Sequence, residues 1–215
     1  AVRCVTQGHS VAVYEAAPRG GGRCRSFMDE GLGCVIDNGS HMLLGANRNT
    51  MEYLDRIGAR ANVTEIRPAA FPFRDIRTGV QWTLRPGSPF LPLWLLDARR
   101  RVPGSAPRDY LKAFRLMRAD KSATVAGCIG ANDPMMETFW QPLCEAVLNT
   151  DAREASARLL WKALSLSFFK GEPACRPMIF NHGLGTALVD PAIRLLKNKG
   201  AIVRFQARLR GLRWQ

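Results

Sequence analysis

The sequence contains no long apolar run. None of its 215 residues belongs to a stretch of the about 18 consecutive apolar residues that a transmembrane helix needs. The most apolar segment, Phe90 to Leu96, is interrupted by Pro92 and is soon followed by three arginines. These features exclude a membrane-spanning helix, but they leave contact with a lipid surface or the lining of an apolar pocket open.

Paired cysteines are also missing. The six cysteines are scattered without a C-x-x-C pair, and the three histidines share no ligand spacing with them, so we expect no metal site. The cysteines are expected either as buried small hydrophobic residues or as exposed thiols in a reducing compartment. No secretory signal is visible, although Ala1 is not an initiator methionine and an upstream segment could have carried one. We expect a cytoplasmic protein.

Acidic residues are few, since 31 lysines and arginines stand against 18 aspartates and glutamates and give a formal net charge of +13. Such an excess can mark a nucleic-acid-binding protein, but here the basic residues are spread over the whole length. The densest run, Arg99 to Arg101, adjoins the apolar segment, which fits anionic lipid head groups better than nucleic acid. A solvated arginine-rich surface explains this arrangement of arginines equally well. We expect no nucleic-acid partner and leave peripheral membrane contact open.

What the sequence does contain is an ordinary globular composition, with 47% hydrophobic and 23% charged residues, enough for one domain or two small ones. Residues 1–9 are predicted to be the end of a helix, and Val11 to Glu15 are predicted to be a short strand whose last residue is acidic. A helix end, a tight turn and such a strand form the second half of a βαβ nucleotide-binding unit. The first strand and its Gly-rich turn would lie upstream, so we expect the given sequence to begin inside the crossover helix.

The remaining segments alternate between strand-like and helix-like patterns. Strands are predicted at residues 24–28, 34–36, 178–180, 201–205 and 208–214, with two or three more between 62 and 85. Helices are predicted at residues 47–57, 108–119, 134–148, 153–168 and 188–199, and residues 86–107 as a loop or short helices. This order places a mixed β and helical region between two parts of a nucleotide-binding fold.

We therefore predict an α/β fold, α+β overall, in which an incomplete Rossmann-like domain carries an inserted substrate domain. Residues 1–60 and 176–215 are assigned to the dinucleotide-binding domain, and residues 61–175 to the insertion. This interleaving is typical of two-domain flavoproteins.

Two neighbouring features indicate a nucleotide site. An acid at the end of the second strand, here Glu15, can accept hydrogen bonds from both ribose hydroxyls of an adenine dinucleotide. Gly20 to Gly22 let the backbone come near a phosphate, and Arg23 supplies a fork of donors for anionic oxygens. Each alone could be an ordinary surface feature, but their closeness in the sequence favours binding.

A third feature, Asp37 to His41, follows an apolar strand. Small residues flanked by an acid and a histidine suit a backbone that passes close to a flat cofactor. His41 could equally be a hydrogen-bonded core histidine or a residue in contact with the flavin or the substrate.

The run E-A-A-P-R-G-G-G-R-C-R-S, followed by D-N-G-S-H, resembles the FAD-containing amine oxidase and phytoene desaturase superfamily. The segments N-G-S-H-M-L-L-G-A-N-R, F-W-Q-P-L-C and L-N-T are similar to its squalene-associated branch, the hydroxysqualene dehydroxylases of bacterial hopanoid gene clusters. The resemblance covers essentially the whole chain. It implies FAD as the cofactor and an apolar isoprenoid as the substrate.

The resemblance also implies roles for single residues. Glu15 would hold the adenosine ribose, Gly22 and Arg23 would pack near the pyrophosphate, and the backbone at Leu209 would lie on the adenine. Gly39 to His41 would approach the isoalloxazine ring. The predicted FAD-binding residues are Glu15, Ala16, Gly21, Gly22, Arg23, Gly39, Ser40, His41 and Leu209.

The implied reaction is the reductive removal of an allylic hydroxyl from hydroxysqualene to give squalene, with His41 as the nominal proton donor. The alternatives are a carotenoid-type desaturase or amine oxidase of the same superfamily, a basic protein that binds lipid or nucleic-acid surfaces, and an inactive fragment. The family's G-x-G-x-x-G turn and C-terminal portion are not in the given sequence. We therefore expect this chain alone to bind FAD poorly or not at all.

Overall fold

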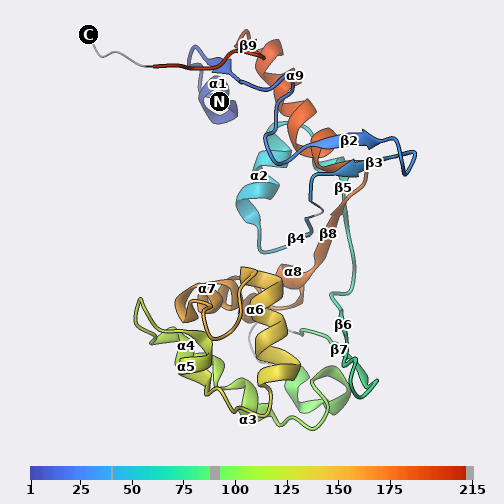
Figure 1. Ribbon diagram of the computed structural model, residues 1–215, viewed down its shortest axis with the longest axis vertical. Helices are drawn as coiled ribbons and strands as arrows, with labels where there is room; N and C mark the ends of the chain where they lie inside the picture. Colours follow the sequence, from blue (N-terminus) through green and yellow to red (C-terminus); the bar gives the residue numbers. More distant parts are fainter. Residues whose placement is uncertain (40, 88–92, 212–215) are drawn as a thin grey trace. The chain divides into compact units, whose positions relative to one another are not determined.

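The computed structural model describes residues 1–39, 41–87 and 93–211 and divides into two compact units (Figure 1). Unit 1 consists of Ala1–Leu43, Asn47–Glu65 and Met178–Gln215, and unit 2 of Leu44–Ala46 and Ile66–Pro177. The boundaries predicted from the sequence lie after residues 60 and 175. The assignment of the two units to cofactor and substrate remains a prediction.

Unit 1 contains a parallel pair of strands, each preceded by a helix. Strand β1 (Ala12–Tyr14) follows α1 (Val2–Thr6), and β9 (Ile202–Arg204) follows α9 (Asp190–Asn198). Val13 lies opposite Val203 in the parallel register. Because parallel neighbours are joined through crossover connections, this pair confirms the α/β fold class expected for a nucleotide-binding half.

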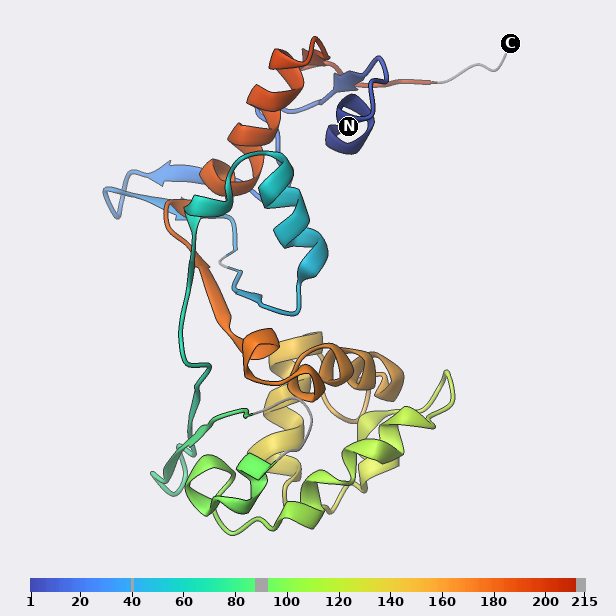
Figure 2. The same ribbon diagram turned by 180° about the vertical axis from the view of Figure 1, so that it is seen from behind.

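An antiparallel hairpin makes up the second part of unit 1. It consists of β2 (Ser26–Asp29) and β3 (Cys34–Asp37), with Ser26 opposite Asp37. The predicted strand at 24–28 begins later than expected, because the Cys24 amide donates to the Gly21 carbonyl at 2.9 Å and closes a turn there. Helix α9 runs between this hairpin and the β1–β9 pair (Figures 1 and 2).

The remaining elements of unit 1 build its small core. They are α2 (Arg48–Arg56), η1 (Arg60–Asn62), β5 (Val63–Glu65), β8 (Pro177–Phe180) and the π-helical turn η6 (Gly185–Val189), with β4 (Leu43–Leu44) preceding α2. β5 and β8 pair antiparallel, with Thr64 opposite Ile179. The apolar stripe predicted on the helix at 47–57 is confirmed, since Met51, Leu54 and Ile57 are buried.

Unit 2 is mainly helical. It opens with the hairpin of β6 (Phe71–Arg74) and β7 (Gln81–Leu84), in which Phe73 and Trp82 stack with ring centroids 5.5 Å apart. Short helices follow, namely η2 (Leu93–Leu96), η3 (Ala98–Arg100), α3 (Pro107–Tyr110), α4 (Ala113–Met117), α5 (Val125–Ile129), η4 (Met136–Trp140), α6 (Gln141–Leu148), α7 (Ala157–Leu166), η5 (Phe168–Lys170) and α8 (Glu172–Cys175).

Two helices of unit 2 differ from the sequence prediction. The helix predicted at 108–119 is broken into α3 and α4, because the Leu111 and Phe114 amides bond to carbonyls three residues back and tighten the chain into a turn. Helix α5 was not predicted. It begins where the Thr124 hydroxyl accepts a hydrogen bond from the Gly127 amide at 3.1 Å, a cap that a polar residue in an apolar stretch can supply.

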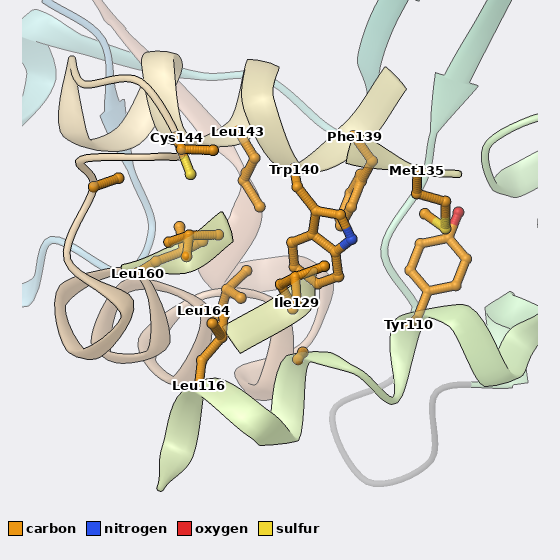
Figure 3. Packing of buried hydrophobic residues seen from close by; sticks show 14 of the residues in the cluster. Tyr110, Leu116, Ile129, Met135, Phe139, Trp140, Leu143, Cys144, Leu160 and Leu164 are labelled. Carbon is orange, nitrogen blue, oxygen red and sulfur yellow. The ribbon is translucent and has the colours of Figure 1, made fainter. Parts of the chain in front are cut away.

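One large hydrophobic core fills unit 2 (Figure 3). Trp140 is 1% exposed and its ring meets Phe139 edge-on, with centroids 4.9 Å apart. Tyr110 meets Phe139 in the same manner at 5.4 Å. The aromatic and apolar residues of the F-W-Q-P-L-C segment thus belong to the core of unit 2.

One sequence prediction needs correction. Arg208 to Gly211 are not in a strand, because the last backbone hydrogen bond of this segment runs from the Ala207 amide to the Glu15 carbonyl at 2.9 Å; the rest of the predicted strand lies outside the described residues. Within the segment 90–101, Trp94 and Leu95 are only 9% and 7% exposed and belong to the core, whereas Leu93 and Leu96 are 60% and 68% exposed, so contact of this segment with a lipid surface stays a prediction. Across the described residues, no helix is long and apolar enough to cross a bilayer.

Candidate cofactor site

Glu15 is fixed at the end of β1 by its backbone and its own side chain. Its amide donates to the Arg204 carbonyl at 2.9 Å, and its carbonyl accepts from the Ala207 amide at 2.9 Å. The carboxylate oxygen Oε1 accepts a hydrogen bond from the Ala17 amide at 2.8 Å. One carboxylate oxygen is therefore held by the turn that follows the strand, which orients the half-buried side chain.

The glycine loop after Glu15 lies against η6 and α9. A Cβ at Gly21 would come within 2.6 Å of the Cys24 carbonyl oxygen and 2.7 Å of Val189 Cγ2, and Gly21 has a φ of +101°. A Cβ at Gly20 would approach Ile193 Cδ1 to 2.9 Å. At Gly21, where the near atom belongs to the backbone and φ is positive, only glycine lets the chain pack this closely, whereas at Gly20 the Ile193 side chain could give way.

A cavity of about 470 Å³ opens between these elements, a volume within the range of small-molecule sites. Its wall is largely apolar, and Glu15 supplies the carboxylate at its edge. The residues that line it are Ala1, Val2, Arg3, Val13, Glu15, Gly20, Gly21, Tyr53, Leu188, Val189, Ala192, Ile193, Leu196, Val203 and Phe205. Such a site can hold a flat heteroaromatic group and can bond a neighbouring hydroxyl.

Tyr53 lines the same cavity and was not predicted from the sequence. Its hydroxyl donates to the Leu188 carbonyl at 2.8 Å and so ties α2 to η6. Burial, followed by the nearby Cys24 thiol, raises the pKa of Tyr53, which keeps it a neutral donor. Its partner is 135 positions away in the sequence, so no local pattern could have indicated the contact.

A polar junction ties the β2–β3 hairpin to the segment before α9. The Ser26 hydroxyl donates to Asp37 Oδ1 at 2.5 Å, and the same carboxylate oxygen accepts from the Leu184 amide at 2.9 Å. The Gly185 amide donates to Ser26 Oγ at 2.9 Å. Asp37, the acidic residue of the D-N-G-S-H segment, thus positions the backbone at Leu184.

The structure brings only some of the predicted cofactor residues together. Glu15 and Gly21 line one cavity, and Ala16, Gly22 and Arg23 are exposed on the loop beside them. The loop is joined to β3 through Asn38, whose side-chain amide donates to the Arg23 carbonyl at 3.4 Å.

The remaining predicted residues lie away from this cavity. Gly39 has a φ of +140° and His41 is exposed, with its Nε2 atom 3.9 Å from where a Gly39 Cβ would be. Leu209 is 67% exposed. Ser40 lies outside the described residues. Within the described part of the chain, no three His, Cys, Asp or Glu side chains gather as a metal site.

A family model described as flavin containing amine oxidoreductase matches residues 1–215. The chain belongs to this family. The match confirms the superfamily recognised in the E…G-G-R and D-N-G-S-H segments, and it confirms a flavin as the cofactor.

Relatives with curated names show which members of this flavin family the chain is similar to. The chain is 39% identical over 212 residues to hydroxysqualene dehydroxylase from Rhodopseudomonas palustris, and 38% identical over 212 residues to the enzyme of that name from Sinorhizobium fredii. Each alignment covers 99% of this chain and 51% of the relative. The chain therefore spans about half the length of the curated relatives it matches.

More distant similarities agree with the family. The chain is 23% identical over 238 residues to a probable zeta-carotene desaturase from Synechococcus elongatus, covering 100% of this chain and 48% of the relative. Among solved structures, a triple mutant of putrescine oxidase with redesigned cofactor binding superposes with a TM-score of 0.57 at 16% identity, over 100% of this chain and 48% of the other. That likeness shows the fold alone.

Proposed function

We propose that the chain forms the adenosine-binding part of an FAD site in an enzyme that converts hydroxysqualene to squalene. The observation that carries this proposal is the similarity to hydroxysqualene dehydroxylases at 38–39% identity over almost the entire chain. The cavity at Glu15 supports it independently, because it places a carboxylate beside a close-approach glycine.

The residues of the cavity fit an adenosine group. The Ala17 amide occupies Oε1 of Glu15, which leaves the second carboxylate oxygen to accept bonds from ribose hydroxyls. Val13, Val203 and Phe205 offer apolar surface for the adenine. In the proposal, Ala16, Gly22 and Arg23 continue toward the pyrophosphate, Leu209 lies on the adenine, and Gly39, Ser40 and His41 border the flavin ring.

Reduced FAD, when bound, supplies the two electrons of the reduction, and the substrate hydroxyl leaves as water. In the proposal, His41 gives the proton to the departing hydroxyl. Unit 2 would serve as the inserted substrate domain and shield the apolar chain from water.

The cofactor proposal is tested by titrating FAD into the purified chain and following flavin fluorescence. We expect weak binding with less than one flavin per chain after purification, and Glu15→Gln to weaken it at least about tenfold, because hydrogen bonds to a carboxylate are among the strong ones. Glu30→Gln, in the exposed β2–β3 turn, is the matched control. Equal losses in both variants, or full flavin occupancy in Glu15→Gln, would reject Glu15 as the ribose ligand.

The reaction is tested with hydroxysqualene, FAD and a chemical reductant, with squalene as the product measured. His41→Gln should lower turnover at saturating FAD by roughly a hundredfold or more, the usual share of a general acid. His182→Gln, a second exposed histidine of unit 1, is the control.

A carotenoid-type desaturase is the second candidate, favoured by the 23% identity to the probable zeta-carotene desaturase. It would act on an apolar isoprenoid in the oxidative direction. Conversion of zeta-carotene by the same preparation, with hydroxysqualene left untouched, would replace the first proposal by this one.

A further inference from the structure

We propose that unit 2 docks onto an anionic lipid surface through an aromatic cluster formed by Phe114, Trp161 and Phe169. This inference goes beyond the proposed function, because binding to such a surface requires neither flavin nor isoprenoid substrate. It rests on the packing of these three rings, on their exposure and on the charges that surround them.

The three rings form one contiguous cluster. Phe114 on α4 lies 5.9 Å from Trp161 on α7 and 5.4 Å from Phe169 on η5, and the last two are 5.1 Å apart, all between ring centroids. Nevertheless Phe114 is 45% and Phe169 38% exposed. Packed aromatic rings left open to solvent mark an interaction surface, and aromatic rings are favoured at the boundary between water and lipid.

The helices extend this apolar surface. Met117 lies one turn beyond Phe114 on the same face of α4 and is 48% exposed. Leu111 precedes them by one turn and is 56% exposed. The aromatic cluster is therefore flanked by aliphatic side chains that can enter the same apolar layer.

Basic residues dominate the segments that carry the cluster, although Asp120 and Glu172 lie two residues beyond their ends. Residues 111–118 and 157–170 contain Lys112, Arg115, Arg118, Arg158, Lys162 and Lys170 and no aspartate or glutamate. Arg118 follows Phe114 by four residues, and Arg158 precedes Trp161 by three, so both lie beside the rings on their helices. Anionic head groups complement such a rim of cations.

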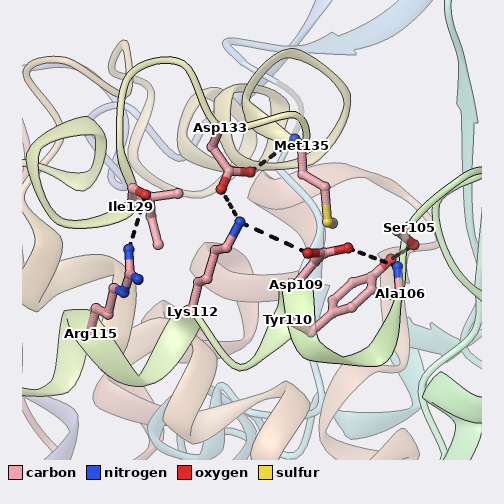
Figure 4. A network of polar contacts seen from close by, with 9 residues as sticks. All are labelled: Ser105, Ala106, Asp109, Tyr110, Lys112, Arg115, Ile129, Asp133 and Met135. Carbon is pink, nitrogen blue, oxygen red and sulfur yellow. Dashed lines mark hydrogen bonds and ion pairs between the residues drawn. The ribbon is translucent and has the colours of Figure 1, made fainter.

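Two of the six cations serve the interior of unit 2 (Figure 4). Lys112 pairs with Asp133 and lies 3.9 Å from Asp109, and Arg115 donates to the Ile129 carbonyl at 3.4 Å. By contrast, Arg118, Arg158, Lys162 and Lys170 are exposed, and within the described residues none of them pairs with a carboxylate. These four are available for head groups.

This surface differs from the one that the sequence indicated. Around Phe90 to Arg101, the described residues Trp94 and Leu95 are buried, while Arg100 and Arg101 donate to the carbonyls of Pro86 and Leu95. Those groups stabilise unit 2 internally. In the same segment Leu93 and Leu96 are 60% and 68% exposed and Arg99 is exposed, but no aromatic ring among its described residues is open to solvent, as Phe114 and Phe169 are at the aromatic cluster.

The test is co-sedimentation of the purified full chain with vesicles of phosphatidylcholine alone or with a quarter of phosphatidylglycerol. We expect at least about tenfold tighter binding to the anionic vesicles. Phe114→Ser combined with Phe169→Ser should weaken that binding at least tenfold. Arg118→Glu combined with Lys162→Glu should do the same, because each cation near an anionic surface contributes roughly fivefold.

Two controls separate the cluster from the net charge of the chain. Ile76→Ser removes an apolar side chain that is 90% exposed elsewhere in unit 2. Lys197→Glu combined with Lys199→Glu makes the same charge change on and just after α9. Both controls should bind like the wild type, and a thermal melt should show that every variant is folded.

Equal weakening in the controls would show diffuse attraction to the whole chain and overturn the proposal. Absence of vesicle binding would overturn it as well. A dimer that dissociates in the Phe114→Ser, Phe169→Ser variant, without vesicle binding, would assign the cluster to a second copy of the chain. Quenching of Trp161 by brominated lipid, lost in Trp161→Phe, would place the cluster at the bilayer.

Discussion

The two units differ in what their buried side chains do. Among the described residues, unit 2 packs twenty buried side chains into one cluster around Trp140. The described part of unit 1 has two small clusters, of six and three buried residues, and next to them an open cavity at Glu15. Burial of apolar surface is the main contribution that stabilises a folded protein. The apolar side chains of unit 2 therefore mainly stabilise its fold, whereas some of those in unit 1 line a cavity instead.

This difference has a thermodynamic consequence. A unit with little buried apolar surface opens at a lower free energy than one with a continuous core. A ligand that binds only the closed form raises that free energy. We therefore expect unit 1 to be the less stable unit, and its stability to depend on the occupant of the cavity.

The largest expected effect is in thiol reactivity. Cys4, Cys24 and Cys34 of unit 1 are exposed, whereas Cys144 and Cys175 of unit 2 are buried. Burial raises the pKa of Cys144 to about 11 and that of Cys175 to about 12, so neither forms the reactive thiolate near neutral pH.

With an aromatic disulfide reagent at pH 8, the exposed thiols should react at least about a thousandfold faster than Cys144 and Cys175, because the buried thiols must wait for unit 2 to open. Mass spectrometry of the labelled peptides measures each rate. If Cys175 were labelled as fast as Cys24, unit 2 would not bury this thiol in solution and the comparison would be wrong.

A smaller effect is expected from core truncation. Trp140→Ala in unit 2 should cost about 3–5 kcal/mol of unfolding free energy, because the dense core cannot collapse around the lost ring. Leu54→Ala in unit 1 should cost less, about 2–3 kcal/mol, since its cluster is small and lies beside a cavity. Urea titration measures both changes, with tryptophan fluorescence for unit 2, which holds four of the five tryptophans.

Trp140→Phe is the control for this comparison. The Trp140 indole nitrogen is buried and has no hydrogen-bond partner among the described residues, so its removal forfeits no bond. Trp140→Phe should cost less than about 1.5 kcal/mol. Equal losses of unfolding free energy in Trp140→Phe and Trp140→Ala would show that the volume of the Trp140 ring is not what stabilises unit 2.

Local sequence patterns predicted the elements that local forces determine. The helix at 47–57 has apolar residues at helical spacing and Gly58 at its end, and α2 lies there. The strand predicted at 208–214 failed within its described part because a strand needs a partner, which no local pattern provides. The break between α3 and α4 was missed because Leu111 and Phe114 fit a continuous helix by composition.

The same reasoning applies to the site. Glu15 and Gly21 were predicted together because they lie on one short loop, and the cavity does unite them. Tyr53 and Val189 were missed, because only the folded chain brings α2 and η6 to that loop. In unit 2, the rings of Phe114 and Trp161 meet across two helices, so the cluster is likewise invisible in the linear sequence.

The smallest expected effect concerns one ion pair of unit 2. Glu172, whose side chain is 20% exposed, accepts hydrogen bonds from Arg176 Nε at 2.9 Å and from the Ala69 amide at 2.8 Å. These bonds, the one from Arg176 foremost, lower the pKa of Glu172. A carboxyl whose pKa is lower in the folded state stabilises that state above its unfolded pKa, about 4.3, and loses this effect as the pH falls through the folded value.

Glu172→Gln should therefore destabilise unit 2 by about 1–2 kcal/mol at pH 7 and by less at pH 3, because the wild-type protein loses this contribution as the pH falls toward and through the lowered pKa of Glu172. Glu137→Gln is the matched control, because Glu137 pairs with Arg77 at 2.5 Å but is 70% exposed, so its loss should fall within error. Urea titrations at both pH values measure the change. A cost for Glu172→Gln that stays constant from pH 7 to pH 3 would show that the charge is irrelevant, and that unit 2 is held by packing alone.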